Sequence, residues 1–336
     1  MPEVERPVPA PDLQGGSWVQ GGPLSLAQLK GKVVLVDFWD YTCVNCLRTL
    51  PYLKEWHRRY GGSGLTIVGV HAPEFSFARD ALPVRSTAVA AGLDYPIVLD
   101  NDRKIWRAYS NRYWPAKYLV DGRGLVRYVH FGEGAYGETE EAIQKLLRET
   151  GPGLALPPLM EPVRDSDRPG TACYMVTPEL YLGYQRGRLG NPRGYTPDQV
   201  AEYHDPGRHA EGYVYLSGRW LCNAEAALYA GSSGEGTIAL RYTAKEVNLV
   251  LNPLSGQPGT LTVRQDGLPL DPHDAADDVL RDGAGRPCVT VDGPRMYRLV
   301  NNRELGSHEL ALSTASAGLG AYAFTFVSCV VPGDEG

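Results

Sequence analysis

Hydrophobic and polar positions in the first part of the chain follow the period of a strand and the period of a helix in turn. The apolar run at 33–39 is typical of a buried strand. Apolar residues then recur at helical spacing over 44–60, and the glycines within 61–64 end the helix. Four or five strands in a mixed central sheet, with helices on both faces, predict an α/β fold. The further elements expected are strands at 65–71, 96–99, 116–121 and 125–131 and helices near 78–91, 102–109 and 139–150.

The second half of the chain has a different pattern. Short apolar runs, among them 213–216, 236–242 and 247–251, are separated by turn residues at fairly regular intervals. This pattern is typical of an antiparallel β-sandwich or jelly roll. A stretch between the halves is rich in proline and charge, shows no period, and is interpreted as a linker. The expected organisation is a first domain over 1–152, a linker over 153–170 and an all-β domain over 171–336.

Two cysteines lie where the first predicted strand gives way to the helix. Cys43 and Cys46 are three residues apart, which allows a disulfide between them. Cys43 stands at the helix N-terminus, where unpaired N–H groups and the helix dipole stabilise a thiolate. Dithiol chemistry is the leading hypothesis, and half of a zinc site or two inert core cysteines are the alternatives. The other cysteines are isolated in the sequence: Cys173, Cys222, Cys288 and Cys329.

Two further residues near the cysteines point to the same chemistry. Asp37 lies six residues before Cys43, inside the apolar strand. Burying a carboxylate there costs free energy, which indicates a functional role for Asp37. Trp114-Pro115 precedes another predicted strand, and a proline at that position is a candidate for a cis peptide bond facing the disulfide.

These residues resemble the thioredoxin family. Asp37, Cys43, Cys46, Pro51 and Pro115 match in turn the family's buried acid, nucleophilic cysteine, resolving cysteine, helix-kinking proline and cis-proline. The family's usual Trp-Cys-Gly-Pro-Cys is replaced here by the sequence of residues 42–46. Substrate preference and redox potential are therefore not carried over.

Longer stretches resemble the soluble part of the DipZ family. The resemblance implies a TlpA-like thioredoxin domain, in which residues 73–99 supply an inserted helix and strand, followed by a β-sandwich similar to carbohydrate-binding modules. Residues 177–184 and 321–326 are similar to the first and last strands of that sandwich. The membrane-embedded, electron-delivering part of DipZ has no counterpart in this chain. The matching motifs of the first domain lie at 39–53, 69–75, 99–102, 113–121 and 130–134.

The expected reaction is thiol-disulfide exchange. Cys43 attacks a substrate disulfide, and Cys46 then attacks Cys43 and releases the reduced substrate. Because only the thiolate is nucleophilic, we expect the pKa of Cys43 to fall from about 8.5 towards the range of roughly 3.5 to 7.5. Asp37 is expected to accept the proton of Cys46, or alternatively to cap a backbone group. The TlpA-like resemblance and Asp37 favour a reductant, and no cofactor besides the Cys43–Cys46 disulfide is expected.

Several residues are candidates for the substrate-binding wall of this site. Thr42, Val44 and Asn45 flank the cysteines. Pro115 leaves its neighbouring backbone free to pair with an extended substrate. Trp114 either packs over the disulfide or fills core. The remaining candidates are His71, as a proton carrier near neutral pH or a structural residue, and Glu74.

The function of the second domain is more open. Its aromatic residues either stack on sugars or protein side chains, or fill the core of the sandwich. Cys173, Cys222, Cys288 and Cys329 form two bridges if the chain is exported and are buried free thiols if it is cytoplasmic. The aromatic residues concerned are Tyr181, Tyr184, Tyr195, Tyr203, Tyr213, Tyr215 and Trp220.

Composition limits the partners. The chain has 336 residues, more than usually form a single domain core, and its 43% hydrophobic content supports folding. A net charge of −6 argues against nucleic-acid or anionic-membrane partners. The sequence contains no run of about 18 apolar residues, the length needed to span a bilayer. Residues 1–11 contain no apolar core of a signal peptide. As written, the chain is expected to be cytoplasmic, or periplasmic or extracellular if a leader has been removed.

Three functional classes follow. The first is a thiol-disulfide oxidoreductase with protein substrates and an upstream thiol donor or acceptor. The second is a thiol peroxidase of the peroxiredoxin kind, for which a Thr-x-x-Cys pattern is expected, whereas Thr42 directly precedes Cys43. The third is a glycan- or protein-binding protein in which the dithiol is secondary.

Overall fold

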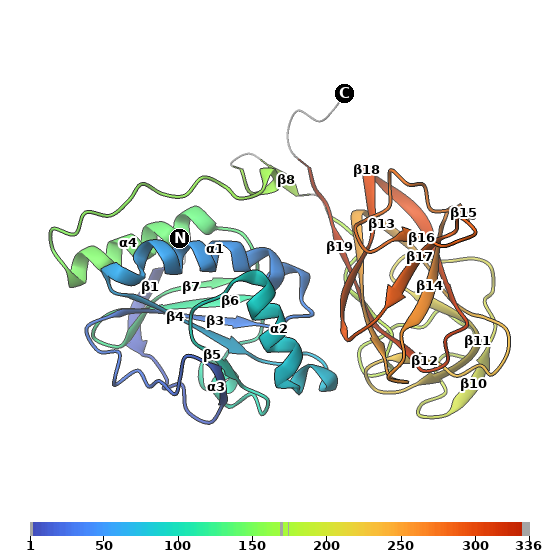
Figure 1. Ribbon diagram of the computed structural model, residues 1–336, viewed down its shortest axis with the longest axis horizontal. Coiled ribbons are helices and arrows are strands. Elements are labelled where there is room, and N and C mark those ends of the chain that lie inside the picture. Colours follow the sequence, from blue (N-terminus) through green and yellow to red (C-terminus); the bar gives the residue numbers. More distant parts are fainter. Residues whose placement is uncertain (1–2, 169–170, 174, 331–336) are drawn as a thin grey trace. The chain divides into compact units, whose positions relative to one another are not determined.

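The computed structural model describes residues 3–168, 171–173 and 175–330, and the chain divides into two compact units (Figure 1). Unit 1 spans Met1–Asp167 and unit 2 spans Arg168–Gly336. The boundary follows residue 167 and falls within the predicted linker 153–170, most of which groups with unit 1.

Unit 1 is built on a seven-stranded mixed sheet in the order β1-β7-β6-β3-β4-β5-β2. The pairs β3–β4 and β4–β5 are parallel. The other neighbouring strands are antiparallel. The strands are β1 (Glu3–Pro9), β2 (Ser17–Gln20), β3 (Val33–Trp39), β4 (Leu65–His71), β5 (Ile97–Leu99), β6 (Ala116–Val120) and β7 (Leu125–Phe131).

The N-terminal segment supplies two strands that the sequence pattern does not predict, so the expected number of four or five strands is wrong. β1 pairs with β7 and β2 pairs with β5, each at an edge of the sheet. Neither segment has a clear apolar alternation, because an edge strand buries little of its surface. The prolines of β1, Pro7 and Pro9, also suit only an edge position.

The helices of unit 1 agree closely with the predicted ones. Helix α1 (Val44–Tyr60) has the expected bounds and contains Pro51. Helix α2 (Ala81–Ala91) begins later than expected because Ser76–Arg79 form a separate 3-10 turn. Another 3-10 turn, Gly61–Ser63, follows α1. The other helices are α3 (Lys104–Ala108) and α4 (Tyr136–Thr150).

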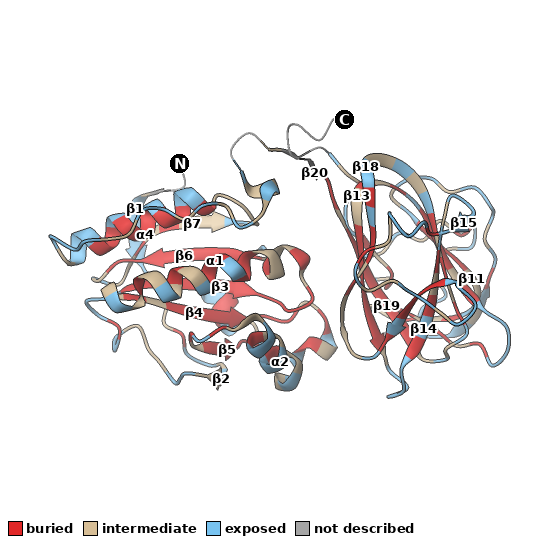
Figure 2. Ribbon diagram, turned by 45° about the horizontal axis from the view of Figure 1, so that its top comes forward, coloured by how far each residue is buried: buried red, intermediate tan, exposed pale blue. Residues whose placement is uncertain are grey.

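Side chains of β3 alternate between two apolar cores, one on each face of the sheet. Val34 and Val36 pack with residues of α3 on one face. Leu35 and Trp39 pack with residues of α1, α2 and α4 on the other. Every residue of β3 is buried (Figure 2). Asp37 is two positions from both Leu35 and Trp39, so its side chain lies on the face that α1 covers.

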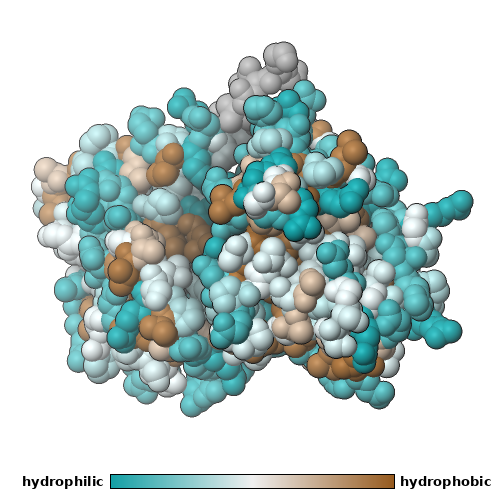
Figure 3. Space-filling view, turned by 45° about the vertical axis from the view of Figure 1, so that its right-hand side comes forward, coloured by the Kyte–Doolittle hydropathy of each residue, from teal (hydrophilic) through white to brown (hydrophobic). Residues whose placement is uncertain are grey.

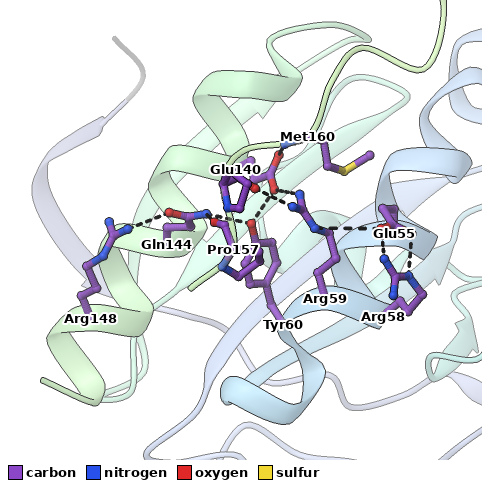
Figure 4. A network of polar contacts seen from close by, with 10 residues as sticks. Glu55, Arg58, Arg59, Tyr60, Glu140, Gln144, Arg148, Pro157 and Met160 are labelled. Atoms are coloured by element: carbon purple, nitrogen blue, oxygen red, sulfur yellow. Dashed lines mark hydrogen bonds and ion pairs between the residues drawn. The ribbon is translucent and has the colours of Figure 1, made fainter. Parts of the chain in front are cut away.

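The segment 154–167, which we call the strap, lies against α1 and α4. Gln144 of α4 donates a hydrogen bond to the carbonyl oxygen of Pro157 at 2.8 Å, and Glu140 accepts one from the backbone N–H of Met160 at 2.9 Å (Figure 4). Arg59 of α1 pairs with the same Glu140 at 2.7 Å. The carbonyl of Pro157 and the N–H of Met160 are thus satisfied by side chains of α4.

Tyr52 of α1 holds the far end of the strap. Its hydroxyl donates to Asp167 at 2.6 Å and accepts from the N–H of Val163 at 2.8 Å. We expect Tyr52→Phe to lower the free energy of unfolding by about 1–2 kcal/mol, because the Asp167 carboxylate and the N–H of Val163 lose partly buried hydrogen bonds. Urea unfolding measures this loss, and trypsin cleavage after Arg164 should be faster. Tyr113→Phe at a side chain that is 55% exposed is the control, and equal cleavage in both variants would contradict the role of Tyr52.

Unit 2 is an all-β unit whose strand pairings are antiparallel, as the sequence predicts. Eleven strands form one sheet, and β8 and β20 form a separate pair. The strands are β8 (Ala172–Cys173), β9 (Leu180–Tyr181), β10 (Val200–Tyr203), β11 (Val214–Cys222), β12 (Ala227–Tyr229), β13 (Gly236–Pro253), β14 (Gly259–Gln265), β15 (Leu268–Pro269), β16 (Leu280–Arg281), β17 (Pro287–Val291), β18 (Arg295–Thr314), β19 (Leu319–Val327) and β20 (Cys329–Val330).

Two long strands organise unit 2. β13 has 18 residues and β18 has 20, and they pair along most of their length with register shifts near Ala244 and Val247. The first part of β13 also pairs with β11 and its last part with β19. The sheet encloses an apolar core, to which β18 contributes near both of its ends and β13 along most of its length.

Three of the seven aromatic residues singled out in unit 2, and two of its four cysteines, lie in the core. Tyr203, Tyr215 and Trp220 are buried, which fits the core-filling interpretation. Cys222 and Cys288 are buried free thiols, so the alternative with two disulfide bridges is wrong. The backbones of Cys173 and Cys329 pair across β8 and β20, but their side chains lie outside the described part of the chain.

The described surface of unit 2 carries scattered apolar side chains. On the face shown in Figure 3, hydrophilic and neutral residues predominate. Exposed apolar side chains come from separate strands and turns, for example Val200, Leu254 and Leu280. Scattered exposed apolar residues are ordinary on protein surfaces. Sugar or protein binding by this unit stays a prediction.

Candidate functional site

The two cysteines stand at the start of α1. Cys43 is the N-cap residue, and its sulfur accepts a hydrogen bond from the backbone N–H of Cys46 at 3.2 Å. The Cys46 thiol donates to the Cys43 sulfur at 2.6 Å. Cys43 is partly exposed and Cys46 is buried. The sulfur atoms are thus adjacent, and only that of Cys43 is accessible to a substrate.

The pKa of Cys43 differs from the sequence expectation. Burial raises the pKa of the Cys43 thiol, hydrogen bonds from Cys46 oppose the rise, and the negative charges of Glu74 and Asp40 add to it. The expected fall is therefore wrong for the dithiol state. Burial raises the pKa of Cys46 well above its ordinary value. Because the rise is larger for Cys46, Cys43 ionises first and is the better nucleophile of the two.

Asp37 is a buried carboxyl group without hydrogen bonds. It is 1% exposed, and neither of its oxygens has a hydrogen-bond partner among the described residues. The alternative that Asp37 caps a backbone group is therefore wrong. Burial raises the pKa of Asp37 to about 7, although the positive charge of Lys117 opposes the rise. A carboxyl group with this pKa exchanges a proton readily near neutral pH.

Lys117 is a buried residue of the site that the sequence analysis did not single out. It lies directly opposite Asp37 in the antiparallel pair β3–β6, and its side chain is fully buried. Its ammonium donates to the carbonyl oxygen of Gly132 at 3.3 Å and lies 5.7 Å from the ring centre of Tyr136. Burial lowers the pKa of Lys117, and the negative charge of Asp37 opposes this most strongly. A lysine within a buried strand is the sequence signal that could have revealed it.

We expect Lys117→Met to raise the pKa of Asp37 above 7 by roughly one unit, because the variant loses the positive charge that stabilises the carboxylate. The pH profile of disulfide reduction should shift upward by the same amount. Lys104→Met, which removes a lysine that is 56% exposed, is the matched control. A pKa of Asp37 that is unchanged in Lys117→Met, measured by NMR titration, would rule out this coupling.

A glycine makes room beside Asp37. Gly69 of β4 is in register with Asp37, and a Cβ atom there would lie 3.1 Å from the indole nitrogen of Trp39 and 3.3 Å from the ring of Tyr95. A larger residue would therefore displace these rings. The Tyr95 hydroxyl is also close enough to Asp37 for the carboxylate charge to raise the pKa of Tyr95, although burial is the larger cause.

Trp114 and Pro115 are the first of the residues predicted to form the substrate-binding wall. The Trp114-Pro115 peptide bond is cis, as the sequence suggests. Trp114 donates from its indole nitrogen to the carbonyl oxygen of Ala72 at 2.9 Å, and the Arg103 guanidinium lies 4.9 Å from its ring centre. Trp114 and Cys43 pack against the same apolar core. The Trp114 ring is thus held at the edge of the apolar core by its hydrogen bond to Ala72 and by Arg103.

His71 does not suit the predicted role of proton carrier. It is fully buried, and burial lowers its pKa to about 3, so the ring is neutral near pH 7. Its ring stacks on that of Tyr41 at 5.7 Å between centres. Glu74 donates its backbone N–H to Asp40.

The residues flanking the cysteines hold the local structure. Thr42 donates two hydrogen bonds to Asp40, from its N–H and its hydroxyl. Val44 is buried. Asn45 accepts a hydrogen bond from the hydroxyl of Thr49 through its carbonyl oxygen.

Within residues 3–168, 171–173 and 175–330, no group of three or more histidine, cysteine, aspartate or glutamate residues is placed to hold a metal ion. No helix in these ranges combines the length and the apolar character needed to cross a membrane.

Comparisons with known proteins connect both units to described families. Residues 4–129 match the AhpC/TSA family, and residues 177–326 match the family described as "Thioredoxin like C-terminal domain". The thiol-disulfide oxidoreductase YkuV of Bacillus subtilis is 30% identical over 143 residues, which cover 42% of this chain and 96% of YkuV. A solution structure of a thioredoxin-like protein in the oxidized form is 29% identical and covers 44% of this chain and 99% of that one, with a TM-score of 0.41.

DipZ proteins match across both units. Protein DipZ of Mycobacterium bovis and that of Mycobacterium tuberculosis are each 36% identical over 325 residues, which cover 94% of this chain. The chain spans 42% of the length of these relatives. It is therefore a homologue of the DipZ proteins over nearly its whole length, with the thioredoxin-like unit first and the all-β unit second.

Proposed function

We propose that this chain is a thiol-disulfide oxidoreductase that exchanges disulfides with protein substrates through Cys43 and Cys46. The observation that carries the proposal is the arrangement of the two sulfurs at the N-terminus of α1, with the partly exposed Cys43 accepting from Cys46. Asp37, with a pKa of about 7, lies on the sheet face beneath this helix. The name of YkuV supports the same reaction class.

The proposed reaction moves two electrons from the dithiol to the substrate. The Cys43 thiol loses its proton to water, and the thiolate attacks a substrate disulfide, forming a mixed disulfide and releasing one substrate thiolate. Cys46 then gives its proton to Asp37, and its thiolate attacks the Cys43 sulfur. The Cys43–Cys46 disulfide forms, the second substrate thiolate leaves, and the released thiolates take up protons. No cofactor besides this disulfide is required.

The reducing direction is supported by the pKa values of the thiols. A couple is strongly oxidising when its reduced form is stabilised, as when a thiolate is favoured. Here burial raises the pKa of both Cys43 and Cys46, so the site does little to stabilise a thiolate. The pair is therefore expected to act as a reductant that depends on an upstream thiol donor for its regeneration.

Insulin reduction in the presence of dithiothreitol tests the proposal against a peroxidase. The wild-type chain should accelerate insulin reduction and consume hydrogen peroxide no faster than Cys43→Ser does. Equilibration with glutathione of known redox state then gives the potential of the couple. Rapid peroxide consumption without insulin reduction would reject the proposal in favour of a thiol peroxidase.

A further inference from the structure

A second buried carboxylate lies next to the dithiol and has no role in the reaction above. Asp40 follows β3 by one residue and is fully buried. One of its oxygens accepts hydrogen bonds from the N–H and the hydroxyl of Thr42, at 2.7 and 2.8 Å. The other accepts from the N–H of Glu74 at 2.6 Å. The carboxylate thus joins the dithiol loop, residues 40–43, to the segment that follows β4.

The backbone of Asp40 contacts both cysteines. Its carbonyl oxygen accepts from the N–H of Cys43 at 3.2 Å. Its N–H interacts with the sulfur of Cys46 and favours the thiolate of that residue. A shift of Asp40 would therefore move both sulfur atoms.

The charged and titratable groups around Asp40 belong to β4, to the segment after it, to the start of α3 and to the dithiol. From β4, the ring nitrogen Nε2 of the neutral His71 lies 3.8 Å from the carboxylate. From the start of α3, the positive charge of Arg103 acts on Asp40, and Glu74 and the two cysteines complete the surroundings. Burial is the largest effect and leaves the pKa of Asp40 raised, while the hydrogen bonds from Thr42 and Glu74 and the charge of Arg103 oppose the rise.

The hydrogen-bond pattern favours the charged form of Asp40. Both N–H groups that it accepts from can only donate, and the Thr42 hydroxyl is positioned to donate as well. A carboxylate accepts all three hydrogen bonds, whereas a protonated carboxyl would have to direct one proton away from them. The negative charge is therefore held in place by both segments that the carboxylate joins.

We propose that Asp40 is a positioning residue of the redox centre. It fixes the dithiol loop and places a buried negative charge beside Cys43, so that Cys43 is less reactive as a nucleophile while the pair is in the dithiol state. This inference rests on the proposed function. It gives this residue a part, beside burial and the charge of Glu74, in two features that distinguish this site from a simple helix N-terminus. The first is the fixed loop geometry, and the second is a thiol that ionises less readily than its N-cap position implies.

Replacing Asp40 by asparagine tests the charge separately from the packing. We expect the midpoint of the pH profile for alkylation of Cys43 by iodoacetamide to fall by about one unit or more. A tenfold larger thiolate fraction is partly offset by lower nucleophilicity, with a Brønsted coefficient of about 0.4–0.5. The alkylation rate at pH 7 should therefore rise about threefold, as followed by mass spectrometry of the peptide that contains Cys43.

Asp100→Asn is the matched control. Asp100 is also buried and accepts three backbone hydrogen bonds, from Lys104, Ile105 and Trp106, but at the start of α3. Its replacement should destabilise the chain without moving the alkylation profile. If Asp40→Asn is folded and its profile coincides with those of wild type and Asp100→Asn, the proposal is wrong.

A second variant keeps the test decisive if Asp40→Asn does not fold. Arg103→Gln removes the positive charge that partly compensates Asp40, so the alkylation midpoint should move to higher pH, opposite to the effect of Asp40→Asn. No shift, or a shift to lower pH, would overturn the proposal. Alkylation requires no protein substrate, so this result is independent of whether the wild-type chain reduces insulin.

Discussion

Replacing Cys43 by serine is expected to abolish disulfide reduction and to lower the insulin-reduction rate by roughly 1000-fold or more, because a serine hydroxyl cannot replace the attacking thiolate. Cys46→Ser should have a different effect. Cys43 still attacks the substrate in this variant, but no thiol resolves the product. A covalent complex of chain and substrate should therefore accumulate.

Mass spectrometry under non-reducing conditions distinguishes these outcomes. The mixed disulfide should appear with Cys46→Ser and be absent with Cys43→Ser. Cys222→Ser is the control, because Cys222 is a buried free thiol of unit 2 and its loss should leave the rate unchanged. A mixed disulfide that accumulates with Cys43→Ser instead would reverse the assigned roles of the two cysteines.

Asp37→Asn is expected to stabilise the chain at neutral and alkaline pH. The pKa of Asp37 is raised from 3.8 to about 7 in the folded chain, so the folded state binds the proton more tightly than the unfolded state. The wild-type free energy of unfolding therefore falls as the pH rises from about 4 to about 7. A shift of about three units corresponds to about 4 kcal/mol, and we expect a gain of roughly 2–4 kcal/mol for Asp37→Asn at pH 8.

Urea unfolding at two pH values checks this prediction. The difference between Asp37→Asn and wild type should be large at pH 8 and nearly absent below pH 4, where Asp37 is protonated in both states. A difference of the same size at both pH values would mean that packing, and not the charge of Asp37, is responsible. The same variant should slow release of the reduced substrate from the mixed disulfide by about 100-fold, because Cys46 loses its proton acceptor.

Much of the site could be predicted because local signals mark it. The apolar run of β3 makes Asp37 conspicuous, and the change from strand to helix period places Cys43 at the N-cap. Lys117 was missed because a single lysine usually indicates an exposed position. Only the register of β3 with β6 shows that it opposes Asp37.

The pKa of Cys43 could not be predicted from local signals. The helix N-terminus argues for a lowered pKa, and that effect is local. Burial by the fold is the largest opposing effect, and the charges of Glu74 and Asp40 add to it. Glu74 lies 34 residues after Asp40 and is brought to the dithiol loop by the parallel pairing of β3 and β4. The same limitation applies to the strap, since only the fold brings Tyr52 to Val163.

The two strands supplied by the N-terminal segment have a consequence for truncated fragments. An unpaired row of N–H and C=O groups invites association with another chain. In the intact chain, the outermost strands are β1, which carries two prolines and charged residues, and the four-residue β2. A fragment that begins near Lys32 would instead leave β7 and β5 outermost, and it should aggregate or dimerise through them while the intact chain stays dispersed, which light scattering would reveal.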